Sequence, residues 1–358
     1  MVVEQYSIAT ASRYNFPLPT MDTMLPRRFI ESSIRSLTES MNNIQLNQYN
    51  LQYASMDNTQ SARLKLPPLS LKPRNTETMV AAVDTSTIKL GETDTGLLMA
   101  VRGATVWRQS KTYRYTRIGP FVFHITEQNK HNVFDTLEKA YFDPRQSQNH
   151  HALPNLLQMP TRIAGLLEKW LQLMLAKTVS KGLILLDGSL TCGMPDVPTS
   201  LLRDILSTAR LNNNMVLAFS KMTTLRINGH IITEFPIGQK PPYIIELEGL
   251  KPKPPSMLLG DVYVAKLSSG NCSFRMDIDK EATFEQRIWA VEKLIANDLL
   301  SQSYPETLRL SHILCTFTAN EVIAMQHFAT RKYGLKIVNR PDMHSLLFGP
   351  FGKGEYYS

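Results

Sequence analysis

The sequence predicts an α/β fold in which a mixed β-sheet carries helices on its faces. From Thr76 onwards, three strand-like segments come first, and helical and strand-like segments then alternate. Short connections favour antiparallel pairing within the first three strands, and the β-α-β units that follow favour parallel pairing. The chain has 358 residues, 43% of them hydrophobic, which is enough for one large domain or two modest ones with a sizeable core.

Composition narrows the class of protein. The formal net charge of +8 and the sequence pI near 9.3 favour polyanionic partners over acidic proteins. Cys192, Cys272 and Cys315 lie far apart without a C-x-x-C spacing, which excludes a zinc ribbon and disfavours a disulfide framework. The N-terminus lacks a basic stretch followed by an apolar one, and no segment is long and apolar enough to span a bilayer. We therefore expect a soluble, cytoplasmic protein.

Residues 1–75 differ in character from residues 76–358, so we expect an N-terminal helical extension and linker before the main domain. Apolar residues spaced by three and four from Ile30 to Ile44 predict an amphipathic helix. Such a helix docks either on its own domain or on another chain. The Leu66-Pro67-Pro68-Leu69 segment then predicts an extended linker.

The order of elements specifies the fold further. We expect strands over Val80–Asp84, Gly96–Trp107 and Phe121–Ile125, a helix over Thr161–Lys177, a strand over Leu183–Asp187, a helix over Thr199–Leu211 and a strand over Met215–Phe219. This is the order of the ribonuclease H-like fold, in which the first and fourth strands are neighbours. Strands near Asp261–Leu267 and Ser273–Ile278 and a helix over Phe284–Leu300 would form C-terminal α+β additions.

Two of the expected strands end in the same way. G-L-I-L-L-D-G-S-L places Asp187 after a buried apolar run, and V-A-A-V-D-T-S places Asp84 after another. An aspartate there needs a compensating partner, and a metal ion is the usual functional one. Alternatively, each aspartate could cap the next helix or close a turn. Because the two strands are neighbours in the expected fold, we predict that Asp84 and Asp187 lie side by side.

The expected helix before the Asp187 strand adds a third carboxylate. Glu168 shares a face with Ala164, Leu171 and Leu175, so an ionised Glu168 would be costly unless it is paired or metal-bound. Alternatively, this turn of the helix reaches the surface. Three carboxylates would suit Mg²⁺ or Mn²⁺ rather than zinc. Two such ions can activate a water and stabilise the leaving oxygen in phosphodiester hydrolysis.

Five blocks in this order resemble the NurA nuclease family, the partner of the HerA-type hexameric DNA translocase in archaeal and bacterial DNA-end processing. The blocks are V-A-A-V-D-T-S, G-L-I-L-L-D-G-S-L, A-F-S-K at Lys221, F-R-M-D-I around Asp277 and Y-P-E-T-L-R-L-S-H from Tyr304 to His312. The last resembles the family pattern Y-P-x-x-L-x-x-A-H. The resemblance covers most of the chain after Thr76.

The resemblance implies an enzyme and a site. Asp84, Glu168 and Asp187 would be metal ligands, His312 a further ligand or the residue that positions the phosphate, and Tyr304 part of the same site. It implies a Mn²⁺-preferring nuclease, with Mg²⁺ as the alternative ion. The enzyme would act as a 5′-3′ exonuclease and single-strand endonuclease in the resection of DNA double-strand breaks. It would be a homodimer that receives DNA from a HerA-like ATPase, with the N-terminal amphipathic region as a candidate interface.

The chain also departs from the family. Thr85 and Ser303 stand where glycine is common, and Ser311 stands where alanine is common. Thr85 matters most, because a branched side chain beside a metal ligand could alter access. Lys221 either binds a phosphate as a point charge or ends its strand in solvent.

Two other interpretations remain open. A non-catalytic DNA-binding or assembly subunit could share this fold, as could an Argonaute-like or transposase-like enzyme. We expect Arg275 and Asp277 to pair with each other along one strand. The sequence contains no G-x-x-x-x-G-K-[ST] motif, so ATP-driven movement would require a partner.

Overall fold

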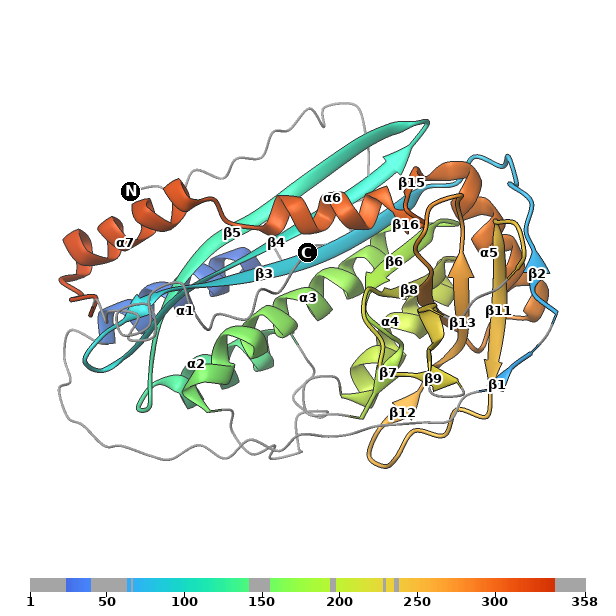
Figure 1. Ribbon diagram of the computed structural model, residues 1–358. Coiled ribbons are helices and arrows are strands. Elements are labelled where there is room, and N and C mark those ends of the chain that lie inside the picture. Colours follow the sequence, from blue (N-terminus) through green and yellow to red (C-terminus); the bar gives the residue numbers. More distant parts are fainter. Residues whose placement is uncertain are drawn as a thin grey trace, which may run out of the picture.

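The computed structural model describes residues 24–39, 63–65, 67–141, 155–193, 198–227, 230–234 and 238–338. In this part of the chain, ten strands form one mixed sheet, and helices cover both of its faces (Figure 1). The strands are β1 (Arg63–Leu64), β2 (Leu69–Ser70), β3 (Val80–Glu92), β4 (Gly96–Gln109), β5 (Thr112–Thr126), β6 (Leu183–Asp187), β8 (Met215–Ser220), β11 (Tyr243–Glu248), β13 (Gly260–Lys266) and β14 (Phe274–Asp279).

Seven α-helices accompany the sheet in the described residues. They are α1 (Met24–Glu39), α2 (Lys130–Tyr141), α3 (Met159–Thr178), α4 (Thr199–Leu211), α5 (Phe284–Asn297), α6 (Glu306–Cys315) and α7 (Ala319–Tyr333). Short strand pairs join β7 (Thr191–Cys192) to β12 (Met257–Leu258), β9 (Arg226–Ile227) to β10 (His230–Ile231) and β15 (Leu300–Ser301) to β16 (Tyr304–Pro305). Two 3₁₀ turns cover Leu156–Gln158 and Ile232–Glu234.

The strand order confirms the expected fold class. Strands β3, β4 and β5 pair antiparallel, β6 pairs parallel with β3, and β8 pairs parallel with β6. The resulting order β5-β4-β3-β6-β8 is that of a ribonuclease H-like core. Strands β14, β13 and β11 then continue the sheet antiparallel beyond β8, so the C-terminal additions extend the core sheet.

The alternation of side chains along β3 divides the core between the two faces. Ala81 and Val83 pack in one apolar cluster with residues of α3 and α4. Val80 and Ala82 pack in a second cluster with residues of α5 and α6. A strand that is buried on both faces reads as a continuous apolar run, which is why the sequence pattern identified it.

The β3-β4-β5 hairpins are longer than the apolar runs suggested. Strand β5 begins at Thr112, although Gly119-Pro120 indicated a later start at Phe121. The register shifts here, because Val101 pairs with Phe121 whereas Gly103 pairs with Ile118. The extra residues form a β-bulge that accommodates Pro120, which has no N–H to donate to the ladder. The strand therefore passes through the proline instead of starting after it.

The N-terminal segment docks on the main sheet. The expected helix from Ile30 to Ile44 is α1, which ends at Glu39, and Ile44 lies outside the described residues. Phe29 is 1% exposed and packs against Phe121 and Phe123 of β5, with ring centroids 4.9 and 6.1 Å away. This face of α1 is thus covered by its own chain.

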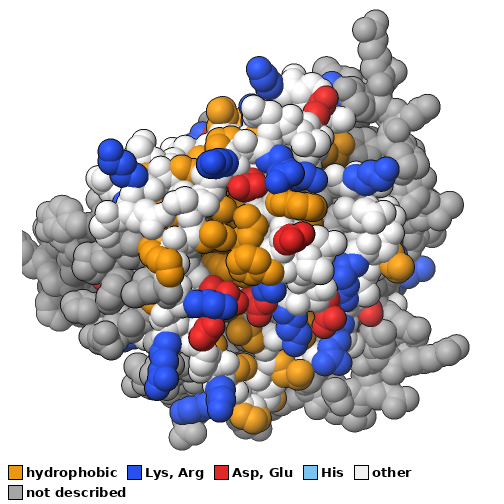
Figure 2. All heavy atoms as spheres, turned by 90° about the vertical axis from the view of Figure 1, so that its right-hand side faces the viewer, with side chains coloured by type: hydrophobic (Ala, Val, Ile, Leu, Met, Phe, Trp, Pro, Cys, Tyr) orange, Lys and Arg blue, Asp and Glu red, His pale blue; other side chains and the backbone are white. Residues whose placement is uncertain are grey.

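The segment before β3 also belongs to the sheet. Strands β1 and β2, in the expected linker, both pair antiparallel with β11 and so form the edge of the sheet. Viewed from the side of β11 and α5, the surface has apolar side chains at its centre and lysine and arginine side chains around them (Figure 2).

Among the described helices, none combines the length and the apolar character that crossing a bilayer requires.

Candidate active site

Asp84 and Asp187 lie on neighbouring strands and face the same side of the sheet. Val83 of β3 is the register partner of Leu186 of β6, and the two aspartates follow these residues directly. By alternation, Asp84 continues the face of Val80 and Ala82, and Asp187 that of Leu183 and Leu185, which all belong to one cluster. Strand β6 ends at Asp187, whereas β3 continues to Glu92. The aspartates therefore meet where the shorter strand stops.

Asp84 is buried and hydrogen-bonded through both oxygens. Its Oδ1 accepts the backbone N–H of Thr85 at 2.7 Å, and its Oδ2 lies 2.7 Å from Nδ1 of His312. Burial raises the pKa of the Asp84 carboxyl, the hydrogen bond with His312 opposes this, and the charge of Asp187 raises it further. An ionised Asp84 can only accept, so Nδ1 of His312 donates this hydrogen bond, and Nε2 is the ring nitrogen that could bind a metal in the neutral form.

His312 comes from α6, which lies across β3 and β4 on the face of the aspartates (Figure 1). Its side chain is 53% exposed, so the imidazole lies between a buried carboxylate and solvent. The loop before the helix contributes to this placement, since the carboxylate of Asp298 accepts the N–H of Thr307 at 3.1 Å in the first turn. The helix thus presents an accessible ring nitrogen beside a buried aspartate.

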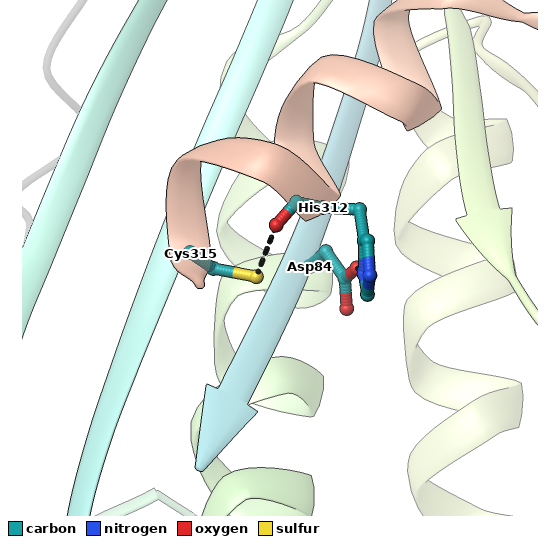
Figure 3. A group of neighbouring side chains, drawn as sticks. All are labelled: Asp84, His312 and Cys315. Atoms are coloured by element: carbon teal, nitrogen blue, oxygen red, sulfur yellow. Dashed lines mark hydrogen bonds and ion pairs between the residues drawn. The ribbon is translucent and has the colours of Figure 1, made fainter. Parts of the chain in front are cut away.

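Cys315, which the sequence did not single out, belongs to the same group. It follows His312 by one helical turn, and its thiol donates to the His312 carbonyl at 3.1 Å (Figure 3). One ligand atom from each of Asp84, His312 and Cys315 lies within 4.8 Å of the others. Burial raises the pKa of the Cys315 thiol to about 12, and the charge of Asp84 acts in the same direction. The H-x-x-C spacing is the signal that could have identified it.

Arg102 fixes the end of α6 and is a second residue that the sequence did not reveal. This buried side chain donates to the carbonyl of Thr316 at 2.9 Å, directly after the helix. It also binds Glu321 of α7 at 2.6 Å. Burial alone would raise the pKa of Glu321, but its hydrogen bonds with Arg102 and Thr318 lower that pKa to about 2. Arg102 of β4, itself buried, therefore holds both α6 and α7 through a partly buried ion pair and a backbone hydrogen bond.

Glu168 lies on α3, which packs on the opposite face of the sheet, and it is not part of the group formed by Asp84, His312 and Cys315. Its side chain is 23% exposed, and Oε1 accepts a hydrogen bond from Nε2 of Gln172 at 2.6 Å. Burial raises the pKa of Glu168, Lys169 lowers it, and the charges of Asp84 and Asp187 raise it further. The three carboxylates are therefore electrostatically coupled. Gln172, four residues along the helix and fully buried, orients Glu168 and was not singled out from the sequence.

Lys221 is the counter-ion of Asp187. Its Nζ lies 2.6 Å from Oδ2 of Asp187, and its side chain remains 40% exposed. The same ammonium lies 5.7 Å from the ring centroid of Tyr304. Lys221 thus stands directly after the end of β8 with an exposed side chain, but it is paired with Asp187. Its binding of a phosphate stays a prediction.

Tyr304 supplies a buried hydroxyl without a protein partner. Its ring packs against Phe219 and Phe274, with centroids 6.2 and 5.2 Å away. Only 8% of the residue is exposed, and Oη has no hydrogen-bond partner among the described residues. Burial raises the pKa of the phenol, as do the charges of Asp187 and Asp84. An uncharged donor thus lies beside the carboxylates.

The hydroxyls of the three residues that depart from the family pattern all bind backbone groups. The Thr85 hydroxyl donates to the Ala164 carbonyl of α3 at 3.3 Å, so the side chain faces α3. Ser303 has φ 69°, a left-handed conformation that favours glycine, and its Oγ lies 3.1 Å from the backbone nitrogen of Ser268, which donates to it. The Ser311 hydroxyl donates to the Leu308 carbonyl at 2.8 Å inside α6.

Arg275 and Asp277 pair as the sequence predicted. Nε and Nη2 of Arg275 each lie 2.7 Å from one oxygen of Asp277. Asp277 is fully buried and also accepts the N–H of Leu190 at 3.0 Å. The pair therefore anchors the loop that follows Asp187.

The carboxylates of Asp84, Asp187 and Glu168 are oxygen donors of the kind that a hard divalent cation takes. Among the described residues, however, the group whose ligand atoms lie within 4.8 Å of one another is Asp84, His312 and Cys315, which includes a softer thiol donor. Burial raises the pKa values of Asp84 and Glu168, and the charges of the neighbouring carboxylates add to this rise. A bound cation would offset this rise.

No protein-family profile matches the chain, and no curated protein matches its sequence. Among solved structures, the NurA nuclease from Sulfolobus solfataricus is 13% identical, with a TM-score of 0.46 over 74% of this chain and 88% of that chain. Endonuclease V from Bacillus subtilis is 10% identical, with a TM-score of 0.35 over 75% and 88%. A further NurA structure is 9% identical, with a TM-score of 0.38 over 74% and 91%. These values are too low to assign a function, so the chemistry must be inferred from the residues of the site.

Proposed function

We propose that this protein is a metal-dependent nuclease that hydrolyses phosphodiester bonds in DNA. The observation that carries the proposal is the position of Asp84 and Asp187 on adjacent parallel strands, facing one side of the sheet, with His312 on Asp84. Glu168, coupled to both aspartates, completes the set. Oxygen-rich sites of this kind take Mg²⁺ or Mn²⁺, and one or two such ions would be held by the three carboxylates, with His312 as a further ligand.

Each residue of the site has its own role in the proposed hydrolysis. When bound, the cation activates a water and stabilises the leaving oxygen in phosphodiester hydrolysis. Asp84, Glu168 and Asp187 would hold the cation, and His312 supports Asp84 through Nδ1 while its Nε2 would serve as a further ligand. Lys221 exchanges its contact with Asp187 for one with a phosphate oxygen. Tyr304 donates its unpartnered hydroxyl to the phosphate or to a water beside it.

The biological setting follows from the resemblance of the five sequence blocks to the NurA family. On that basis the substrate is DNA at double-strand breaks, cut by 5′-3′ exonuclease and single-strand endonuclease activity, with Mn²⁺ preferred. The partners are a HerA-like hexameric ATPase and a second copy of the chain. The net charge of +8 suits a polyanionic substrate.

The test is degradation of an end-labelled single strand of DNA with Mn²⁺ by the wild type and by the Asp187→Ala variant. We expect the wild type to digest the strand and the variant to be at least about a hundredfold slower. Equal digestion by both proteins would mean that the site is misassigned. Failure of the wild type, alone and with a HerA-like ATPase, would favour a non-catalytic DNA-binding subunit on the same fold.

A further inference from the structure

A polar cavity of about 720 Å³ adjoins the carboxylate group. Lys221, whose ammonium binds Asp187, forms one wall of it. The other walls come from the start of β11, the end of β13 and the hairpin that leads into β14, including Lys266, Asn271, Cys272 and Phe274. The volume is within the range of small-ligand pockets. Asp84, Glu168 and Asp187 do not line the cavity, so a ligand in it would approach the carboxylates through Lys221.

The lining provides the groups that a nucleotide requires. Lys266 is partly exposed and forms no ion pair with the residues that the structure describes, so its charge is available to a phosphate. Asn271 offers an amide with two donors and an acceptor. The ring of Phe274 packs against the ring of Tyr304, with their centroids 5.2 Å apart, and it offers an apolar surface next to the site. Glu234 adds one carboxylate to the same lining.

Lys221 lies beside the carboxylates and also lines the cavity, so it connects the two. Its Nζ lies 2.6 Å from Asp187 and 5.7 Å from the Tyr304 ring, while its side chain also lines the cavity. A strand with one phosphate at Asp187 would bring its next nucleotide past Lys221. Single-strand sites combine such cationic tracks with flat apolar surfaces.

We propose that this cavity is a subsite for one nucleotide unit of a single DNA strand, next to the phosphodiester bond that is hydrolysed. The subsite rests on the proposed nuclease function. Lys266 binds the phosphate of that unit, and Asn271 and Phe274 contact its base or sugar. The subsite holds the strand in register with the carboxylates and affects binding more than the chemical step.

Cys272 makes the subsite directly observable. It lies in the lining of the cavity and is the exposed cysteine of the chain, whereas Cys192 and Cys315 are buried. Alkylation of the native protein by iodoacetamide therefore reports on this position. The experiment uses the Asp84→Asn variant with Mn²⁺, so that a short oligothymidylate binds without being digested. We expect saturating oligothymidylate to slow alkylation of Cys272 by about tenfold, because an occupied subsite covers the thiol. A Cys272→Ser variant shows the background.

Lys266 gives a second measurement that does not depend on alkylation. Oligothymidylate binding is measured by fluorescence anisotropy at several salt concentrations. In the Lys266→Gln variant, the negative slope of log binding constant against log salt should become less steep by about 0.7, the value for one phosphate contact on a single strand. Lys139→Gln is the matched control, because Lys139 is exposed at the end of α2, outside the cavity. Its slope should equal that of the unsubstituted protein.

The outcomes separate the subsite from the nuclease function. If the wild type digests single strands while oligothymidylate leaves Cys272 alkylation unchanged, and Lys266→Gln keeps the full salt slope, the subsite is overturned and the nuclease stands. If the wild type neither binds nor digests any strand, the proposed function fails and the subsite fails with it. The subsite is supported if oligothymidylate protects Cys272 from alkylation and the salt slope becomes less steep in Lys266→Gln but not in Lys139→Gln.

Discussion

Nδ1 of His312 lies 2.7 Å from Oδ2 of Asp84, although 228 residues separate the two in the sequence. The contact joins the central strand β3 to the helix α6, which the chain adds after its last sheet strand. Because the hydrogen bond to His312 opposes the rise in the Asp84 pKa that burial causes, the histidine helps to keep this carboxylate ionised. The relationship is the kind of support from a neighbouring side chain that orients metal ligands in proteins.

Replacing His312 tests this support. We expect His312→Ala to lower the rate of Mn²⁺-dependent strand cleavage by about tenfold to a hundredfold, the usual cost of losing a residue that orients a ligand. The rate is measured on an end-labelled single strand. His327→Ala is the matched control, because His327 is exposed on α7. If both variants cleave at the wild-type rate, His312 has no part in the reaction.

For Thr85 we predict a change in stability without a change in the cleavage rate. Its hydroxyl binds the Ala164 carbonyl on α3, so it does not enter the space between Asp84 and His312. Thr85→Val keeps the shape of the side chain and removes one hydrogen bond, which should cost about 1 kcal/mol of unfolding free energy. The cleavage rate should be unchanged. A large loss of activity with intact stability would place the hydroxyl in the reaction after all.

The docking of α1 on β5 predicts an effect on stability far from the site. Phe29 is 1% exposed against Phe121 and Phe123, so Phe29→Ala should lower the free energy of unfolding by about 3 to 5 kcal/mol. Urea denaturation measures the change. Ile34→Ala on the same helix, where Ile34 is 44% exposed, should change it by less than about 0.5 kcal/mol. Equal effects of both substitutions would mean that α1 is not held by its apolar face.

The core strands were predictable from sequence because they are buried on both faces. Val80 to Asp84 and Leu183 to Asp187 are continuous apolar runs with turn residues after them, and this pattern has few alternatives. The outer part of the β3-β5 hairpins was not predicted, because residues such as Thr112 to Thr116 are largely exposed and carry no apolar run. Helices α6 and α7 were missed for a similar reason, since only part of each helix is buried.

Within the site, local sequence patterns pointed to ligands but not to supporting contacts. Asp84 and Asp187 could be paired because strand order follows from the order of elements. The contact between Lys221 and Asp187 was missed, since it depends on the rotamers of two side chains on different strands. The role of Arg102 could not be predicted either, because its partners Thr316 and Glu321 lie 214 and 219 positions away in the sequence.

A buried histidine outside the site predicts how stability depends on pH. His124 is fully buried, and burial lowers its pKa from the ordinary 6.5 to about 4, although the charge of Asp94 opposes this. The unfolded chain binds the proton more readily, so stability is complete above about pH 6.5 and is lost as pH falls towards 4. This group alone should cost about 2 kcal/mol between about pH 7.5 and pH 5.

The measurement is urea unfolding at the two pH values. His124→Gln should be less stable than the wild type at the higher pH, because Thr93 loses its hydrogen bond to Nε2. The variant should nevertheless lose about 2 kcal/mol less than the wild type on acidification. His131→Gln, at an exposed position of α2, is the control and should follow the wild-type curve. Parallel curves for all three proteins would contradict a neutral buried His124.

Glu168 links stability to metal binding. Burial and the charges of Asp84 and Asp187 raise the pKa of Glu168, so its ionised form destabilises the metal-free fold at neutral pH. Glu168→Gln removes the charge and keeps an oxygen that can accept from Gln172. We expect the variant without metal to be more stable than the wild type by on the order of 1 kcal/mol, while its cleavage rate falls.

Mn²⁺ should reverse this order, because a cation bound by the carboxylates stabilises only the protein that can hold it. At a Mn²⁺ concentration about a hundred times its Kd, the wild type should gain about 2.7 kcal/mol, or about 3.6 °C in Tm, and Glu168→Gln should gain much less. Glu281→Gln, at an exposed position, should respond like the wild type. Differential scanning fluorimetry with and without Mn²⁺ gives all three values. An equal shift for Glu168→Gln would remove Glu168 from the ligand set, whatever the outcome of the cleavage assay.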